Sequence, residues 1–322
     1  MPDGGTVLVT AVGGDIGWSV ARILRGCGYF DRVLGCDVAS DHAGRAVVDG
    51  CFVVPRAGDP AYLDALLDLV VRERVEYVVP ISEPEIERIF QATLEGWHPV
   101  RLVMAQGRAI PIGLDKLATA MFLGEIGVPA PWTIPSTDGL PPEFPCVLKD
   151  RRGWGNKNVV LLEDEEALRF HVPRRPDSVL QQLLLPAEEE YTCGVFRSRT
   201  GEVRTIVFRR RLMGGITGSG VVVQDAAIDH VLRTVATALE LRGSINVQLR
   251  RTSAGPTIFE INARFSSTVM FRDLLGFHDV VWSVDDLEGR DVEPYAPPVG
   301  TRVYRVFSEI VQADPVSPPR RP

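Results

Sequence analysis

Lysine is almost absent from this sequence. Of its 35 basic residues only Lys116, Lys149 and Lys157 are lysines, and the others are arginines, a bias typical of a GC-rich genome. Against this bias, each lysine indicates either a position that needs a compact ammonium group in place of a planar guanidinium, or a residue that has persisted by chance. The three lysines are therefore the first candidate functional residues.

Paired cysteines and clustered histidines are missing as well. The cysteine count is odd and no CxxC pair occurs, which indicates buried, reduced thiols in a cytoplasmic protein rather than a disulfide framework. The histidines follow neither HxxxH nor HExxH spacing, so we expect no zinc site. The cysteines stand at positions 27, 36, 51, 146 and 193, and the histidines at positions 42, 98, 171, 230 and 278.

The sequence also lacks a basic block, a long apolar run and a secretory leader. Its formal net charge is -7, which offers no electrostatic footprint for a nucleic acid. No apolar run approaches the roughly 18 residues of a membrane span. Residues 1–5 are acidic and lead directly into an apolar segment, unlike a signal peptide. We therefore expect a cytoplasmic protein with small-molecule partners and neither a nucleic-acid nor a membrane partner.

What the sequence does contain is a regular alternation of apolar strand and helix patterns over 322 residues, of which 45% are hydrophobic. This alternation predicts an α/β fold with two or three subdomains. Strands are expected at residues 6–12, 31–37, 50–55, 75–81 and 102–105, with helices after residue 14, over 60–74 and after residue 82. The series predicts a parallel, doubly wound sheet that ends near residue 110.

The rest of the chain is predicted to be richer in hairpins. Residues 107–113 are expected to form a linker, and a helix over 115–126 is ended by Gly127 and Pro129. Further strands are expected at 132–134, 146–149, 159–162, 179–184, 190–196, 203–210, 221–223, 244–250 and 257–261, with helices over 164–170, 228–241 and 269–275. The proline-rich residues from about 312 are expected to be a disordered tail.

The strongest chemical signal is the last predicted hairpin. Because side chains alternate along a strand, Asn246 and Gln248 share one face of its first strand, and Glu260 and Asn262 share one face of its second. Carboxylate and carboxamide oxygens suit Mg²⁺ held between protein and phosphates. Arg264 continues the same face and could clamp a phosphoryl group. The alternative is an ordinary amphipathic hairpin with a polar face.

A second signal is the strand that ends in Lys149 and leads into the loop 150–158. A lysine at a strand end can meet phosphates as a point charge, and the glycines of the loop allow backbone N–H groups to approach phosphate oxygens. GxxxxGK[ST] is absent, so this is not a Walker A loop. Taken alone, the segment is better explained as a solvated hairpin tip.

A third and weaker signal is the apolar strand 179–184 with Glu190 shortly after it. The backbone of such a strand edge can bind adenine, and a nearby carboxylate can accept hydrogen bonds from ribose hydroxyls. A core strand followed by a charged turn is the alternative.

Taken in order, these elements resemble the ATP-grasp superfamily, and within it the stand-alone ligases similar to carbamoyl-phosphate synthase. The resemblance is carried by Asp115-Lys116, Val147-Leu148-Lys149 with its loop, the segment 179–192, Asn246-x-Gln248 and Phe259-Glu260-Ile261-Asn262-Ala263-Arg264. It covers nearly the whole chain. It implies a Rossmann-like pre-ATP-grasp domain over 1–110, a small lid subdomain over 111–180 and a large subdomain over 181–322. It also implies ATP and Mg²⁺ as cofactors, and by family habit a homodimer.

The resemblance also implies roles for single residues. Gln248, Glu260 and Asn262 would coordinate Mg²⁺, and Arg264 would stabilise the transferred phosphoryl group and the carboxylate substrate. The implied ATP contacts are Lys116 and Lys149 on the phosphates or the N7 side of adenine, Lys157 in the phosphate-covering loop, Gln182, Leu183 and Leu184 as the adenine hinge, and Glu190 on the ribose.

The acceptor side is marked less clearly by the sequence. Arg209-Arg210-Arg211 and the glycine-rich loop 213–220 could hold an acyl phosphate and its carboxylate precursor, with Arg211 as a catalytic residue and Arg209 as a substrate contact. Solvated surface arginines are the alternative.

Five further residues are candidate substrate contacts. Ser266, Ser267 and Arg272 follow Arg264 and could line the same cavity, although a helix cap and a surface charge explain Ser267 and Arg272 as well. Ser82 and Glu83 stand at the carboxyl end of a parallel strand, where such sheets bind ligands. They also match a capping box, which we favour.

The segment Gly13-Gly14-Asp15-Ile16-Gly17 follows the first strand and, together with Asp37, looks like a dinucleotide-binding fingerprint. Its spacing departs from GxGxxG, and in ATP-grasp proteins this domain shapes the acceptor side instead. NAD binding is therefore not favoured, although another ligand at residues 13–17 stays open.

These elements together predict an ATP-dependent carboxylate–amine ligase that forms an amide through an acyl phosphate and releases ADP and phosphate. The first rival function is an ATP-grasp enzyme that forms carboxy- or carbamoyl phosphate from bicarbonate. A single ATP-grasp unit and the lack of a glutaminase signature count against full carbamoyl-phosphate synthesis. A non-catalytic nucleotide-binding protein is the second rival, and an NAD-dependent oxidoreductase is a more remote third.

Overall fold

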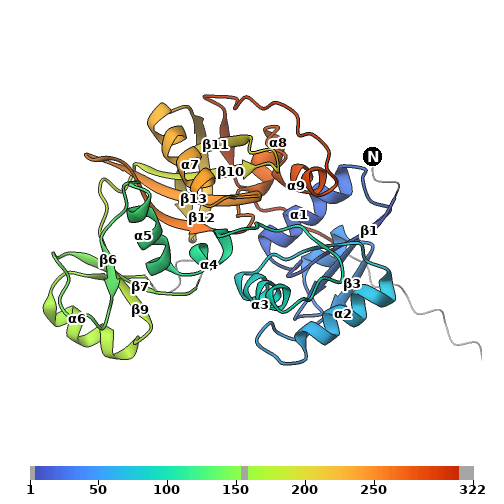
Figure 1. The fold of residues 1–322 in the computed structure, drawn as a ribbon, viewed down its shortest axis with the longest axis horizontal. Coiled ribbons are helices and arrows are strands. Elements are labelled where there is room, and N and C mark those ends of the chain that lie inside the picture. Colours follow the sequence, from blue (N-terminus) through green and yellow to red (C-terminus); the bar gives the residue numbers. More distant parts are fainter. Residues whose placement is uncertain (1–3, 154–158, 312–322) are drawn as a thin grey trace, which may run out of the picture.

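In the part of the chain that the structure describes, three β-sheets and the helices that cover them form the fold (Figure 1). The computed structural model describes residues 4–153 and 159–311, so the tail expected from about 312 lies outside the described residues. Within these ranges, none of the helices combines the length and the apolar character that crossing a membrane requires. The α/β fold class predicted from the sequence is confirmed.

The first sheet is parallel and has the strand order β3-β2-β1-β4-β5. Helix α1 packs on one face and helices α2 and α3 on the other, as a doubly wound sheet requires. The elements are β1 (Thr6–Val9), α1 (Asp15–Gly26), β2 (Arg32–Asp37), the 3-10 turn η1 (Ala43–Val47), β3 (Gly50–Val53), α2 (Tyr62–Glu73), β4 (Tyr77–Val79), α3 (Glu83–Leu94) and β5 (Arg101–Leu102).

A small antiparallel sheet follows, with the order β6-β9-β7-β8. Its apolar side is closed by α6 around Leu148, Leu162 and Leu180. In Figure 1 this unit lies at the far end of the molecule from the first sheet. The elements that lead to it and form it are α4 (Ala109–Gly113), α5 (Lys116–Glu125), β6 (Thr133–Pro135), β7 (Cys146–Asp150), β8 (Val160–Leu162), α6 (Glu165–His171), η2 (Val172–Arg174) and β9 (Ser178–Gln182).

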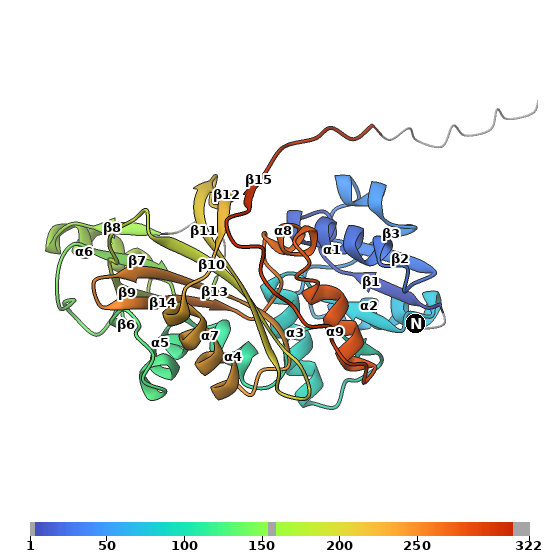
Figure 2. The ribbon, with the colours of Figure 1, turned by 90° about the horizontal axis from the view of Figure 1, so that it is seen from above.

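The third sheet lies between the other two and has the order β14-β13-β10-β11-β12-β15, antiparallel throughout (Figure 2). Helices α4, α5 and α7 bury one face of it, and α8 and α9 pack on the other. Its elements are β10 (Glu190–Arg197), β11 (Val203–Met213), β12 (Ile216–Val223), α7 (Ala226–Ala238), β13 (Gly243–Thr252), β14 (Gly255–Asn262), α8 (Val269–Leu274), α9 (Asp279–Leu287) and β15 (Arg302–Tyr304).

Helices α8 and α9 join the first and third sheets. Val269, Val280 and Val284 of these helices pack in one core with α1. On the side of the third sheet, Trp282 packs against Phe196 at a ring-centroid distance of 5.6 Å. The N-terminal sheet is therefore held against the polar end of the third sheet, where the candidate site lies.

Two expectations about local structure were wrong. Residues 107–113, expected as a linker, contain helix α4, because Ile110 and Ile112 are buried in the main core and this packing outweighs the helix-breaking residues around them. The glycine-rich residues 213–220, expected as a loop, form most of β12. Only Gly214 and Gly215 make the turn, with φ of 59° and 86°, as a two-residue hairpin requires.

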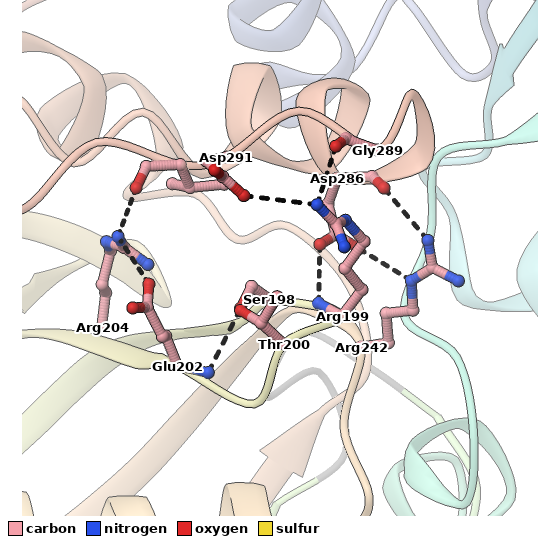
Figure 3. A network of polar contacts seen from close by, with 10 residues as sticks. Ser198, Arg199, Thr200, Glu202, Arg204, Arg242, Asp286, Gly289 and Asp291 are labelled. Carbon is pink, nitrogen blue, oxygen red and sulfur yellow. Dashed lines mark hydrogen bonds and ion pairs between the residues drawn. The ribbon is translucent and has the colours of Figure 1, made fainter.

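Helix α9 was not predicted from the sequence, because buried acidic residues stand among its apolar residues. Asp286, one of several buried acids on this helix, accepts hydrogen bonds from the Arg199 backbone N–H at 2.6 Å and from Arg242 Nε at 2.7 Å (Figure 3). The acids interrupt the apolar period that would reveal a helix. In the fold they tie α9 to the β10–β11 turn and to the residue before β13.

We expect Asp286→Ala to lower the free energy of unfolding by about 2–4 kcal/mol, because it leaves the Arg242 guanidinium without its carboxylate and the Arg199 N–H without an acceptor. Urea unfolding at neutral pH measures this loss. Asp291→Ala is the matched control, because Asp291 belongs to the same network but its side chain is 94% exposed. Equal transition midpoints for the two variants would contradict the anchoring role of Asp286.

Candidate functional site

One face of the third sheet turns polar where β13 and β14 meet. In the antiparallel register Gln248 lies opposite Glu260, and Asn246 lies opposite Asn262. All four side chains therefore lie on the same face, because cross-strand partners point to one face of a sheet and residues two apart on a strand share a face. The hairpin and its shared polar face, both predicted from the sequence, are present.

Oxygen atoms dominate this polar face. Gln248 Oε1 accepts a hydrogen bond from Arg210 at 2.8 Å, and Asn262 Oδ1 accepts one from Arg264 at 3.1 Å. Within the described part of the chain, no side chain donates a hydrogen bond to the Glu260 carboxylate. In the same part of the chain, the buried Nδ2 of Asn262 has no hydrogen-bond partner.

This donor set fits Mg²⁺ bound together with phosphate oxygens. One carboxylate and neutral carboxamide oxygens are hard ligands, and Mg²⁺ in nucleotide sites takes one or two carboxylates and completes its shell with phosphates and water. The unpaired Asn262 amide could donate to such a phosphate oxygen. In residues 4–153 and 159–311 no group of three His, Cys, Asp or Glu residues that could hold a metal ion occurs.

Arg264 continues this face, as predicted, and is held from the N-terminal domain. Its Nε donates to Glu83 Oε1 at 3.0 Å, and its Nη1 donates to the carbonyl of Phe265 at 3.0 Å. Glu83 opens helix α3 and is largely buried. The long-range pair between Glu83 and Arg264 therefore fixes the first sheet against the polar face.

Arg210 is the residue of the arginine run that reaches the site. It is buried, and its guanidinium donates to Glu190 Oε1 at 2.7 and 3.0 Å, to Gln248 Oε1 at 2.8 Å and to Thr217 Oγ1 at 3.5 Å. Three strands, β10, β12 and β13, thus surround the end of this one side chain. From the sequence, roles were assigned to Arg209 and Arg211 of this run, and none was assigned to Arg210.

The selection of Arg211 as a catalytic residue and of Arg209 as a substrate contact is not supported by their positions. Alternation along β11 points both side chains to the face opposite Arg210, where they are exposed. There they line an outer groove with Arg302 and Tyr304, and Arg209 pairs with Glu189 at 3.4 Å. The structure therefore does not bring Arg209 and Arg211 to Glu260 and Arg264.

Lys149 is half-buried at the junction of the small sheet and the third sheet. Its Nζ donates to Gln181 Oε1 at 2.7 Å and lies 5.1 Å from the centroid of the Phe259 ring. Phe259 is the extra residue of a bulge that follows Gln248 in the β13–β14 pairing. Burial lowers the pKa of the Lys149 ammonium to about 8, and the Glu260 carboxylate partly opposes this shift.

Lys149 opens onto a cavity of about 170 Å³ between the two sheets. The predicted hinge residues line it, and so do Gln181, Arg250 and Phe259, which were not selected from the sequence. The full lining is Val147, Lys149, Val159, Gln181, Gln182, Leu183, Leu184, Glu190, Arg210, Gln248, Arg250 and Phe259. The lining combines apolar side chains with polar groups that converge on the same space, and small-molecule sites use both kinds of contact.

Glu190 lines this cavity with both carboxylate oxygens engaged. It accepts hydrogen bonds from Arg210 and from Arg250, whose guanidinium also donates to the Leu184 carbonyl. The sequence suggested a ribose contact for Glu190. In the structure its contacts are with two arginines, so a ribose hydroxyl would have to share these oxygens.

Lys116 does not line this cavity. It begins α5, and its Nζ donates to the Gly153 carbonyl at 2.8 Å, at the point where the loop 150–158 leaves the described residues. Asp115 caps the same helix and pairs with Arg151 at 2.7 Å. Lys157 lies outside the described residues, so its predicted contact with the phosphates stays a prediction.

A second cavity of about 170 Å³ adjoins the first and shares Arg210 and Gln248 with it. The predicted residues Ser266 and Ser267 line it, and so does the start of α1. The full lining is Asp15, Ile16, Thr192, Arg210, Gly215, Ile216, Asn246, Gln248, Glu260, Asn262, Arg264, Ser266 and Ser267. The carboxylate of Glu260 and the guanidinium of Arg264 thus belong to a cavity that is also bounded by the N-terminal domain.

Two candidate substrate contacts have structural roles instead. Arg272 is fully buried behind the polar face, where it pairs with Asp279 at 2.9 Å and donates to Asn246 Oδ1 at 2.5 Å. It therefore supports the cavity wall without lining it. The Ser82 hydroxyl donates to Glu85 Oε2 at 2.6 Å in the capping box of α3, as favoured from the sequence.

The segment after β1 does not have the open glycine loop of a dinucleotide site. Asp37 Oδ2 accepts a hydrogen bond from the Gly13 backbone N–H at 3.0 Å, and the His42 ring packs so closely that a Cβ at Gly13 would lie 2.8 Å from it. The Gly13 N–H is therefore already paired, and the His42 ring fills the space beside Gly13. Asp15 and Ile16, two residues later, face the second cavity instead.

Comparison with known proteins gives sequence matches over parts of the chain. Residues 174–308 match the sequence model of a family described as ATP-grasp in the biosynthetic pathway with Ter operon. A carbamoyl-phosphate synthase of Methanobrevibacter smithii is 34% identical over 124 residues, which are 36% of this chain and 32% of that protein. The aligned region thus spans about a third of the length of this curated relative.

Solved structures are similar over most of the chain. N5-carboxyaminoimidazole synthetase from Staphylococcus aureus, complexed with ADP, has a TM-score of 0.73 at 17% identity, covering 91% of this chain and 79% of that chain. L-amino acid ligase from Bacillus licheniformis has a TM-score of 0.68 at 16% identity, covering 88% and 74%. At these identities the likeness shows a shared fold.

The sequence matches and the structural likeness agree with the resemblance seen in the sequence alone. The matched family region contains the polar hairpin and Arg264, and the shared fold extends to the parallel N-terminal sheet. Residues 174–308 thus match an ATP-grasp family, and over most of its length the chain shares the fold of the two synthetase and ligase structures.

Proposed function

We propose that this protein is an ATP-dependent carboxylate–amine ligase. The observation that carries the proposal is the pair of adjoining cavities that share Arg210 and Gln248. One cavity has the hinge residues and Lys149, which suit a nucleotide. The other has Glu260 and Arg264 on one side and Asp15 of the N-terminal domain on the other, which suits a metal-bound phosphate next to a small acceptor.

In this proposal ATP lies between the lid subdomain, residues 111–180, and the large subdomain that begins at 181. Adenine binds against Leu183 and Leu184, and the ammonium of Lys149 neutralises phosphate charge. Gln248, Glu260 and Asn262 hold Mg²⁺ together with phosphate oxygens. When bound, Mg²⁺ supplies electrostatic stabilisation of the charge that develops on the transferred group.

The protein's own residues position the two reactants and balance their charge. Arg264, fixed by Glu83, binds the acceptor carboxylate so that one of its oxygens faces the terminal phosphorus. That oxygen forms the new P–O bond while the bond to the ADP oxygen breaks. An amine then attacks the acyl carbon, forms the C–N bond and expels phosphate, and its proton is lost to water. Such positioning supplies most of the rate in phosphoryl transfer, and no covalent protein nucleophile is required.

The names of the similar proteins support an ATP-dependent ligase and leave one rival reaction to test. The Bacillus licheniformis structure is an L-amino acid ligase, and the Staphylococcus aureus structure binds ADP. The Methanobrevibacter smithii relative is a carbamoyl-phosphate synthase, which favours bicarbonate as a second candidate acceptor. ADP release measured with amino acids, small carboxylic acids, amines and bicarbonate separates these two reactions, because the ligase needs an organic carboxylate as acceptor and the rival needs bicarbonate.

Glu260→Gln should reduce acceptor-dependent ADP release by roughly 100-fold or more, because it removes the carboxylate of the proposed Mg²⁺ set while keeping the side-chain size. A coupled assay for ADP with saturating ATP and Mg²⁺ measures the change. Glu95→Gln, the same substitution at an exposed position after α3, is the control and should leave the rate unchanged. Normal turnover by Glu260→Gln would remove the basis for the assignment.

ATP binding should weaken as the pH rises through about 8. The protonated Lys149 ammonium binds the phosphates, and its pKa of about 8 means that the charge is present below this pH and is lost above it. The dissociation constant should then rise by up to about tenfold per pH unit. Isothermal titration between pH 6.5 and 9.5 measures it. Lys149→Arg keeps its charge over this range, so an equally steep pH dependence in this variant would exclude Lys149 as the cause.

Arg210→Ala and Arg211→Ala should differ sharply although the residues are neighbours. Loss of Arg210 leaves Glu190 with one partner and frees Gln248, so we expect at least a roughly 100-fold fall in kcat/KM for ADP release. Arg211 points to the exposed outer groove, and its loss should change kcat/KM by less than about threefold. The reverse order would show that the outer face of β11 carries the active site.

A further inference from the structure

Arg305 directly follows β15 and joins two separate segments at the polar end of the third sheet. The backbone N–H of Arg305 donates to the Gly218 carbonyl at 2.7 Å, and its Nε donates to the Thr217 carbonyl at 3.0 Å. Its Nη2 donates to the Ser267 carbonyl. One half-buried side chain therefore links β12 to the loop that follows Arg264.

Both of these linked segments are walls of the second cavity, which is called the acceptor cavity here because the proposed acceptor binds in it. Gly215 and Ile216, directly before Thr217, line it on one side, and Ser266 and Ser267 line it on another. In Figure 2, β15 runs along the edge of the sheet beside β12, the strand that supplies Ile216 of the cavity wall. The two walls come from segments 50 residues apart in the sequence, Thr217 and Ser267, and Arg305 connects their main chains directly.

The contact also reaches Arg210, which lines both cavities. Thr217 is fully buried, and its hydroxyl accepts a hydrogen bond from Arg210 Nη1 at 3.5 Å while its carbonyl accepts from Arg305. Thr217 therefore lies between the two guanidinium groups. A shift of β12 at this point would move both the acceptor wall and the weakest of the Arg210 contacts.

The side chain of Arg305 is suited to this position by shape and charge. A planar guanidinium can donate to two carbonyls that face it from different segments, whereas an ammonium group cannot reach both with the same geometry. The guanidinium lies over the Phe271 ring at 5.1 Å. Burial lowers the pKa of Arg305, and the nearby Asp15 carboxylate, which lines the third wall of the cavity, opposes this shift.

We propose that Arg305 is a positioning residue for the acceptor substrate. It braces the β11–β12 hairpin against the loop at Ser267 and so holds the acceptor cavity in the shape that binds the carboxylate, without touching ATP. The effect of this brace on catalysis rests on the proposed ligase function. The brace itself is a property of the fold.

Arg305→Ala and Arg305→Lys test the brace, with Arg302→Ala as the control on the same strand, where the side chain points into the outer groove. We expect both Arg305 variants to raise the KM for the acceptor roughly tenfold or more, because two hydrogen bonds to a charged group are lost or weakened. The KM for ATP should stay within about twofold of the wild-type value. Arg302→Ala should change neither constant. An unchanged acceptor KM, or an equal rise of both constants, would overturn the proposal.

Hydrogen exchange keeps this test independent of the ligase assignment. In the free protein, the amides of residues 213–220 should exchange faster in both Arg305 variants than in wild type and in Arg302→Ala, while α7 should exchange at the same rate in all of them. If no acceptor supports ADP release by the wild-type protein, the proposed function fails, yet faster exchange confined to the hairpin still supports the brace. Unchanged exchange at 213–220 overturns the brace whatever the activity shows.

Discussion

Both cavities depend on the hydrogen bonds that the buried guanidinium of Arg210 donates. A cation at this depth is tolerated only when anions and acceptors surround it, and here Glu190, Gln248 and Thr217 do so from three different strands. Glu190 in turn is balanced by Arg250, which also holds the Leu184 carbonyl of the hinge. The register of the third sheet, the cavity at Lys149 and the cavity at Glu260 are thus coupled through one charge balance.

Features that depend on local periodicity could be predicted from the sequence. Period-two alternation placed Gln248 and Glu260 on one polar face, and the register confirms this. The capping box at Ser82 was favoured on its spacing and is present. The α/β class and the ATP-grasp resemblance are confirmed, because they rest on the order of many such local signals along the chain. The roles of single site residues stay predictions.

Features that depend on tertiary pairing could not be predicted. Alternation shows that Arg209 and Arg211 oppose Arg210, but which face is turned inward follows from the pairing of β11 with β10 and β12. Arg272 looked like a surface charge or a cavity residue, and its burial depends on Asp279 of a helix whose buried acids hide its apolar period. The scarcity of lysine pointed to a functional ammonium at Lys149, which lines a cavity, and equally to Lys116, which bonds a loop carbonyl.

The most direct test of the ligase mechanism follows a single oxygen atom. If the reaction passes through an acyl phosphate, a carboxylate oxygen attacks the terminal phosphorus and leaves with the phosphate when the amine attacks. With an acceptor labelled with ¹⁸O in its carboxylate, ³¹P NMR of the product phosphate should show one ¹⁸O per molecule formed. Unlabelled phosphate at the same rate of ADP release would mean that water attacks ATP directly, and would contradict the ligase mechanism.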